Sequence, residues 1–198
     1  MATPLTASPS LSLSDFLAQP ETKPATEYVA GHLYPKPMPK GKHSVLQGWL
    51  IAWLNQRGIP TQTYLAFPEL RCTLGDIAPQ GQAQRSLVPD ISVFGWERLP
   101  RDGAGEIAND FAIAPDWAIE ILSPAQSPSR VIDNLLFCLN YGTKLGWLLD
   151  PSEKILISFQ PNQQPQTWSN AAIVPTLFMA DQNLSVEEIF ACLNPFAP

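Results

Sequence analysis

From His43 onward, apolar and polar positions follow a regular pattern. From there, apolar side chains recur three or four residues apart, the spacing that places them on one face of a helix. These side chains are Val45, Leu46, Trp49, Leu50, Trp53 and Leu54. Gly58 stands where such a helix would end. The pattern predicts a helix over residues 43–57.

Short strands are predicted between this helix and residue 94. The stretch TQTYLAFPELRCTL alternates and carries β-branched and aromatic residues on both sides of Pro68, which indicates two short strands. SLVPDISVF, residues 86–94, predicts a third strand. Residues 95–114 contain Gly103, Gly105 and scattered charges, which is typical of a surface loop.

The second half of the chain alternates strands with helices. DWAIEIL predicts a fourth strand over residues 116–122, followed by a helix that begins at Ser127 or Ser129 and ends at Gly142. LGWLLD and KILISF predict two more strands, and VEEIFACL a short amphipathic helix. Because a helix that connects two strands favours parallel pairing, we expect an α/β fold with a mixed central sheet and helices on both faces.

Residues 1–42 show no such periodicity. They are rich in Pro, Ser and Thr, and Pro35, Pro37 and Pro39 exclude a regular helix through YPKPMPKGK. We therefore expect an N-terminal Pro-rich arm over residues 1–42, loosely packed, and one domain over residues 43–198.

Composition sets further limits. A length of 198 residues suits one domain, and Cys72, Cys138 and Cys192 have neither close pairing nor CxxC spacing, so reduced thiols are expected. The start of the chain lacks the pattern of a secretory signal and no apolar run could span a bilayer, so the expected compartment is the cytoplasm, without membrane contact.

The charge balance bears on nucleic-acid binding. A net charge of −6, from 12 Lys and Arg against 18 Asp and Glu, opposes long-range attraction to nucleic acid, so any DNA contact must be local. Lys36, Lys40 and Lys42 form the local basic cluster. They could contact phosphates, and a solvated loop explains them equally well.

Two carboxylates interrupt apolar strands: Asp90 in VPDISV and Glu120 in WAIEIL. A buried charge is costly without a partner or a metal ion. On neighbouring strands the two could converge on one Mg²⁺, or on Mn²⁺ in its place, which would activate water and neutralise phosphate charge. The alternatives are local hydrogen bonds for Asp90 and, for Glu120, an ion pair with Arg85 or Arg130.

Other polar residues have simpler explanations. We expect Asp116 to be an exposed strand start, His43 to be solvated or to cap its helix, and Asp150 to form a turn with the proline after it. Glu69 is a weaker candidate for a third acid.

Four segments in order, VPDISVF, PDWAIEILSP, a helix ending in YG and the strand GWLLDP, resemble the restriction-endonuclease-like proteins of the PD-(D/E)xK nuclease superfamily. The resemblance runs from about His43 to the C-terminus. It implies a restriction-endonuclease-like core in which Asp90 and Glu120 are the two metal ligands. The usual lysine place of the superfamily, two residues after Glu120, holds Leu122.

In the family that the chain resembles, the lysine lies on the following helix, eight residues before its final glycine. That place is Asn134 here, and we expect its side chain to face the site. Asparagine offers only neutral hydrogen bonds near the reacting phosphate, so cation binding could survive while hydrolysis is slowed. Arg130, four residues earlier, shares its helix face and could supply charge instead.

The sequence therefore leaves more than one function open. The first is a Mg²⁺-dependent DNA endonuclease in which Asn134 or Arg130 orients the attacking water and Lys40, Lys42 and Arg130 contact the nucleic acid. The second is a catalytically inactive member of the same fold that binds DNA or a protein. A third is an interaction domain whose acids are structural. A homodimer is compatible with all three.

Overall fold

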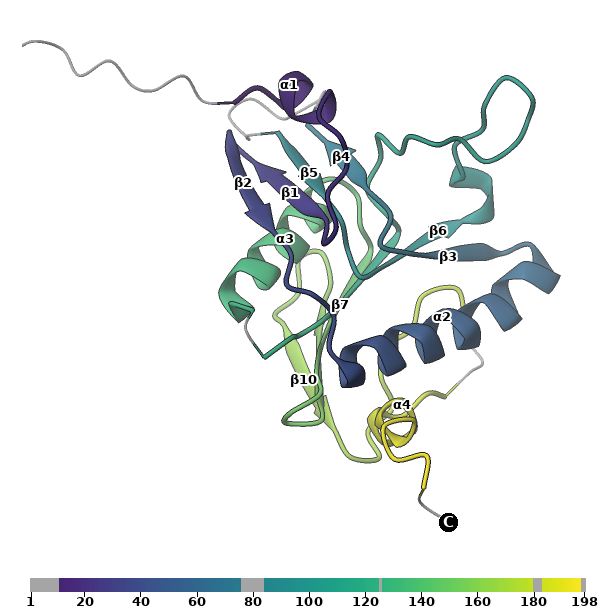
Figure 1. Ribbon diagram of the computed structural model, residues 1–198. Coiled ribbons are helices and arrows are strands. Elements are labelled where there is room, and N and C mark those ends of the chain that lie inside the picture. The colour runs from purple at the N-terminus through teal and green to yellow at the C-terminus, as the bar shows by residue number, and fades with distance from the viewer. Residues whose placement is uncertain (1–10, 76–83, 125, 180–182, 197–198) are drawn as a thin grey trace, which may run out of the picture.

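The chain folds into two β-sheets flanked by helices (Figure 1). A computed structural model describes residues 11–75, 84–124, 126–179 and 183–196. The helices are α1 (Leu13–Leu17), α2 (Gly41–Thr61), α3 (Pro128–Asn140) and α4 (Val186–Ala191), with a 3₁₀ helix η1 (Trp96–Arg98). The strands are β1 (Thr26–Val29), β2 (His32–Pro35), β3 (Tyr64–Pro68), β4 (Cys72–Leu74), β5 (Arg85–Leu87), β6 (Ile91–Gly95), β7 (Trp117–Ile121), β8 (Leu145–Asp150), β9 (Ile155–Phe159) and β10 (Gln166–Ser169).

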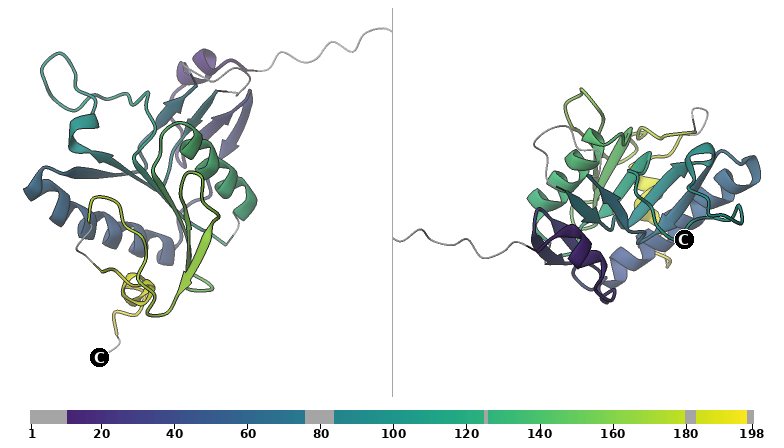
Figure 2. Two further views of the ribbon diagram at one scale, coloured as in Figure 1. Left: turned by 180° about the vertical axis from the view of Figure 1, so that it is seen from behind. Right: turned by 90° about the horizontal axis from the view of Figure 1, so that it is seen from above.

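The larger sheet is mixed, as the sequence predicts. Its strand order is β10-β9-β8-β7-β6-β3. The pair β7–β8 is parallel, and the other four neighbouring pairs are antiparallel. The crossover between β7 and β8 is α3, which packs on one face of the sheet, while α2 and α4 pack on the other (Figure 2). The smaller sheet, β2-β1-β5-β4, is antiparallel and packs against the outer part of α3.

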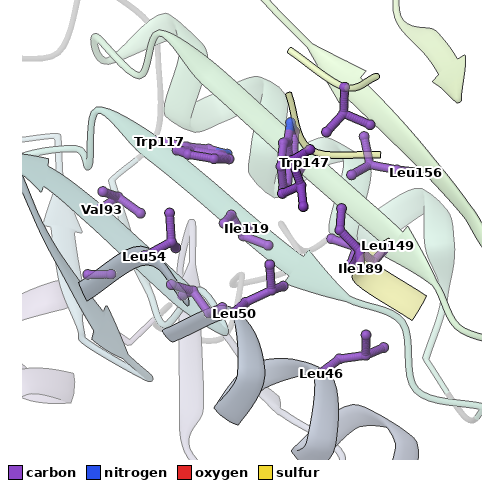
Figure 3. Close-up of a cluster of buried hydrophobic side chains, with 14 of the residues drawn as sticks. Leu46, Leu50, Leu54, Val93, Trp117, Ile119, Trp147, Leu149, Leu156 and Ile189 are labelled. Atoms are coloured by element: carbon purple, nitrogen blue, oxygen red, sulfur yellow. The ribbon is translucent and has the colours of Figure 1, made fainter. Parts of the chain in front are cut away.

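The main core lies between α2, α4 and the larger sheet (Figure 3). Leu46, Leu50 and Leu54 lie four residues apart on α2, so all three reach the sheet and are fully buried. Opposite them, the rings of Trp117 and Trp147 meet edge to face with centroids 4.4 Å apart. This core fixes α2 and β7, which both position side chains of the candidate site.

Helix α2 is longer than the sequence pattern indicates, because Gly58 does not end it. The helix continues to Thr61 through Pro60, and Gln62 closes it with a left-handed backbone conformation. Gly58 is instead a place of close packing, where an added Cβ would meet the backbone oxygen of Tyr64 and lie 2.7 Å from its ring. The glycine serves contact between α2 and β3.

Two glycines of α2 should therefore respond oppositely to alanine. At the exposed Gly48 nothing lies within 4 Å of an added Cβ, so Gly48→Ala should stabilise the protein by about 1 kcal/mol. Gly58→Ala should destabilise it by about 1–3 kcal/mol, because the clash with Tyr64 exceeds the gain in helix propensity. Urea unfolding of both variants checks this. Equal stabilisation by both would contradict the packing at Gly58.

The strand expected over residues 86–94 is in fact two strands in different sheets. β5 ends at Leu87 and β6 begins at Ile91, and the turn between them contains Pro89, which has no N–H for a strand ladder. The chain therefore leaves the smaller sheet and enters the larger one directly before the core. This turn places Asp90 at the junction of the two sheets.

The segment expected to be an arm contains a β-hairpin, so its interpretation as an arm or long loop was wrong for residues 26–35. β1 and β2 pair through a two-residue turn in which Ala30 and Gly31 both have positive φ. These strands are too short and too polar to show periodicity, and α1 and β10 escaped prediction for the same reason. Residues 1–10 of the predicted arm lie outside the described residues.

One simpler expectation, that of reduced thiols, is met. Cys72 and Cys138 are buried free thiols and Cys192 is a partly buried one. In the described part of the chain, no helix combines the length and apolarity needed to cross a membrane.

Candidate active site

Asp90 and Glu120 lie side by side, as the sequence predicts. Asp90 directly precedes β6, and the pairing of Ile91 with Ile119 places Asp90 opposite Glu120 of β7. Both side chains are buried, with 2 % and 4 % of the residue surface exposed. The carboxylates converge on one cation, the ammonium of Lys36, whose Nζ lies 2.7 Å from Asp90 Oδ1 and 3.3 Å from Glu120 Oε2.

Lys36 is the side chain that sequence reasoning placed elsewhere. It follows β2 directly, and its Nζ also donates to the carbonyl oxygen of Val88 at 2.7 Å. The sequence left open whether this lysine of the Pro-rich segment contacts phosphates or is merely solvated, and the β1–β2 hairpin instead brings it to the two acids. Its neighbours in the basic cluster, Lys40 and Lys42, are exposed at the start of α2.

Asp90 is held from several sides. The backbone N–H of Ile121 donates to Oδ2 at 2.7 Å, and Nε2 of His43 lies 3.0 Å from the same oxygen. Gln47, one turn further along α2, donates to the Asp90 carbonyl oxygen at 2.8 Å. The expectation of a solvated or capping His43 was therefore wrong, because the first turn of α2 packs on the turn that carries Asp90.

A third buried carboxylate, Glu27 of β1, was missed. Its Oε1 accepts from the N–H of Val88 at 2.9 Å, and its Oε2 accepts from Nδ2 of Asn134 at 3.0 Å. Asn134 thus lies on the buried face of α3, as expected, but its amide is occupied by Glu27 and by Nη1 of Arg85. A single glutamate in a segment without apolar periodicity gave no signal that could have found it.

The buried acids and Lys36 change one another's ionisation. Burial opposes ionisation of Asp90, but the ammonium of Lys36 and the hydrogen bond of His43 outweigh it and lower the pKa of Asp90. Burial raises the pKa of Glu120 well above its usual value; Lys36 counteracts the rise, and Asp90 and Glu27 add to it. Burial likewise opposes the charge of Lys36, yet the attraction of Glu120 and Asp90 raises its pKa. The ammonium of Lys36 thus lies among three buried carboxyl groups, and the raised pKa of Glu120 favours the protonated form of that acid.

The two arginines considered as partners of Glu120 make other contacts. Arg130 is exposed and its guanidinium lies 4.0 Å from the ring centroid of Tyr34, while Arg85 pairs with Asp133 at 2.7 Å. The ion pair of Glu120 is therefore made with Lys36 and with neither arginine. Contacts of Arg130, Lys40 and Lys42 with nucleic acid stay predictions.

Asp116 was wrongly expected to be exposed. It is fully buried at the start of β7, and its Oδ1 lies 2.7 Å from Nη1 of Arg98 and 2.9 Å from Nζ of Lys144. The N–H of Gly95 donates to its Oδ2, so Asp116 joins β6 to β7 at the end remote from Glu120. Asp150 accepts backbone hydrogen bonds within its own turn, as predicted.

A cavity of about 790 Å³ opens onto this site. Lys36, His43 and Asp90 line it together with Glu69 and Arg71, whereas Glu120 is buried and contacts Lys36. Among the described residues, no three His, Cys, Asp or Glu side chains are grouped as a metal cage. The chain thus offers a carboxylate pair beside an open hollow, with room for water and a substrate to complete the coordination of an ion.

The fold and the carboxylate pair place the chain in the class of restriction-endonuclease-like proteins. The family model described as "Uma2: Putative restriction endonuclease" matches residues 13–193, and the chain belongs to this family. A crystal structure of a "putative nuclease belonging to DUF820" from Anabaena variabilis is 46 % identical, with a TM-score of 0.86. The match covers 92 % of this chain and 99 % of that one. The comparison with curated proteins found no match.

Proposed function

We propose that the chain is a Mg²⁺-dependent endonuclease that hydrolyses phosphodiester bonds of DNA. The observation that carries this proposal is the convergence of Asp90 and Glu120 on one cation, the ammonium of Lys36, beside an open cavity. Membership of a family described as restriction endonucleases supports nuclease chemistry.

The donor set fits a hard divalent ion. Asp90 and Glu120 would hold it, since Mg²⁺ in nucleases is commonly bound by one or two carboxylates while water and substrate phosphate fill its other positions. The ammonium of Lys36 contacts one oxygen of each acid, which supports the proposal that this site accepts positive charge. When bound, such an ion lowers the pKa of water and neutralises phosphate charge, and Mn²⁺ can serve in its place.

The chain's own residues prepare the site for this chemistry. Ile121, His43 and Gln47 fix the orientation of Asp90 before any substrate arrives. Lys36 supplies the full positive charge that Asn134 lacks, and it lines the cavity beside Asp90. The absence of lysine at position 134 therefore does not by itself imply an inactive protein.

A cleavage assay tests the proposal. The protein should nick or cut single- or double-stranded DNA in the presence of Mg²⁺ or Mn²⁺ and lose this activity in EDTA, and calorimetry should detect Mn²⁺ binding. Asp90→Asn, which preserves the shape of the side chain, serves as the inactive control and should bind Mn²⁺ more weakly. If the folded protein binds no Mn²⁺ and cuts none of these substrates, the proposal is wrong and a binding module remains.

A further inference from the structure

Arg71 presents a fixed, positively charged edge to the cavity that contains Asp90. Its Nη1 donates to Ser86 Oγ at 3.1 Å, and its Nη2 donates to the carbonyl oxygen of Thr26 at 3.0 Å. The guanidinium also lies 5.1 Å from the ring centroid of Phe16. Because the smaller sheet and α1 hold it from these sides, the guanidinium keeps one orientation, and its Nε edge faces Glu21.

Glu21 occupies that edge as a bidentate partner. Arg71 Nε donates to Oε1 at 2.6 Å and Nη2 donates to Oε2 at 2.7 Å. The Glu21 side chain is 68 % exposed and belongs to the irregular segment between α1 and β1 that forms part of the cavity wall. Exposed ion pairs contribute little to stability, so this carboxylate can be exchanged for another anion.

The geometry of the pair matches a phosphate as well as a carboxylate. Both present two oxygens to the same edge of an arginine, which is why arginine binds either in a bidentate manner. We propose that Arg71 binds a backbone phosphate of the nucleic acid next to the one at Asp90, and that Glu21 holds this place in the free protein. This inference rests on the proposed function, because it takes DNA as the occupant of the cavity.

The charge of the cavity supports this division of roles. Its wall carries Lys23, Lys36 and Arg71, but Lys36 is occupied by the acid pair and Arg71 by Glu21. In a chain with a net charge of −6, DNA affinity must come from such local contacts. Exchange of Glu21 for phosphate would make the Arg71 contact available when the backbone enters the cavity.

Fluorescence anisotropy with a labelled DNA oligonucleotide in EDTA tests the inference without requiring cleavage. Glu21→Gln should tighten binding about two- to fivefold, since the competing carboxylate is removed. Arg71→Gln should weaken binding about tenfold and reduce the slope of log K against log salt by about 0.9, the signature of one lost phosphate contact. The double variant should behave like Arg71→Gln alone.

Glu97→Gln is the matched control, because Glu97 is an exposed glutamate beyond the other end of β6 from Asp90. It removes the same formal charge without touching the cavity. If Glu21→Gln tightens binding no more than Glu97→Gln, or if its gain persists without Arg71, the inference is wrong even where metal-dependent cleavage is intact. If the expected pattern appears in a protein that cuts no DNA, the phosphate contact stands and the proposed hydrolysis does not.

Discussion

Lys36→Met is expected to slow metal-dependent DNA cleavage about a hundredfold or more, because oriented positive charge near the reacting phosphate is removed. The same change should tighten Mn²⁺ binding. The ammonium of Lys36 now shares the oxygens of Asp90 and Glu120 that an ion needs, so its removal leaves these carboxylates free for the metal. Tighter Mn²⁺ binding together with slower cleavage would show that the charge of Lys36 acts in catalysis and does not merely neutralise the two carboxylates in the absence of metal.

Stability provides a second measurement on the same variant. Without Lys36 the buried carboxylates of Asp90 and Glu120 lose their shared ammonium, and breaking a buried ion pair costs about 3–5 kcal/mol. Lys36→Met should therefore melt at a lower temperature in EDTA and gain more from Mn²⁺ than the wild type does. Arg101→Met, which removes an exposed charge in the loop after η1, is the control and should change neither property. Unchanged cleavage by folded Lys36→Met would leave Lys36 with a structural role only.

The sequence predicted the acid pair because burial of charge is visible in a local pattern. Asp90 stands directly before an apolar strand and Glu120 within one, and the helix after Glu120 predicted a parallel neighbour for β7. The spacing of apolar residues, and the glycines and prolines that interrupt it, were enough to predict most of the helices and strands from β3 onward. Where packing overrides local preference, as at Gly58 and Asp116, the same reasoning gave the wrong boundary or the wrong exposure.

The partners of the acids could not be predicted in this way. Lys36 lies 84 residues before Glu120, and Glu27 lies 107 residues before Asn134, so no pattern within one segment relates them. Their contacts depend on the β1–β2 hairpin, whose turn is made by Ala30 and Gly31 and whose strands are only four residues each. A hairpin this short is marginally stable alone and is stabilised by the pairing of β1 with β5. That pairing depends on the whole fold and leaves no local pattern in the sequence.

The structure also changes the meaning of Asn134. At this position a lysine would extend toward Glu27 from α3, whereas Lys36 reaches Asp90 and Glu120 from the end of β2. The two positions approach one cluster of carboxylates from different elements. An ammonium at either position would place positive charge beside these buried acids, and the neutral amide at 134 is compatible with the ammonium already present on Lys36.

Asn134→Lys should consequently have different effects in two backgrounds. In the wild type it should change cleavage little, because Lys36 already supplies the charge and the new ammonium must replace the hydrogen bonds of Asn134 to Glu27 and Arg85. Combined with Lys36→Met it should restore cleavage at least about tenfold, since charge near the transition state is the missing property.

Asn134→Gln in the same background is the neutral control and should restore nothing. Single-turnover rates at saturating Mg²⁺ measure the effect independently of metal affinity. An equal gain from Asn134→Lys with and without Lys36 would show that the two positions act independently, and Lys36 would then not be the source of the charge that position 134 lacks.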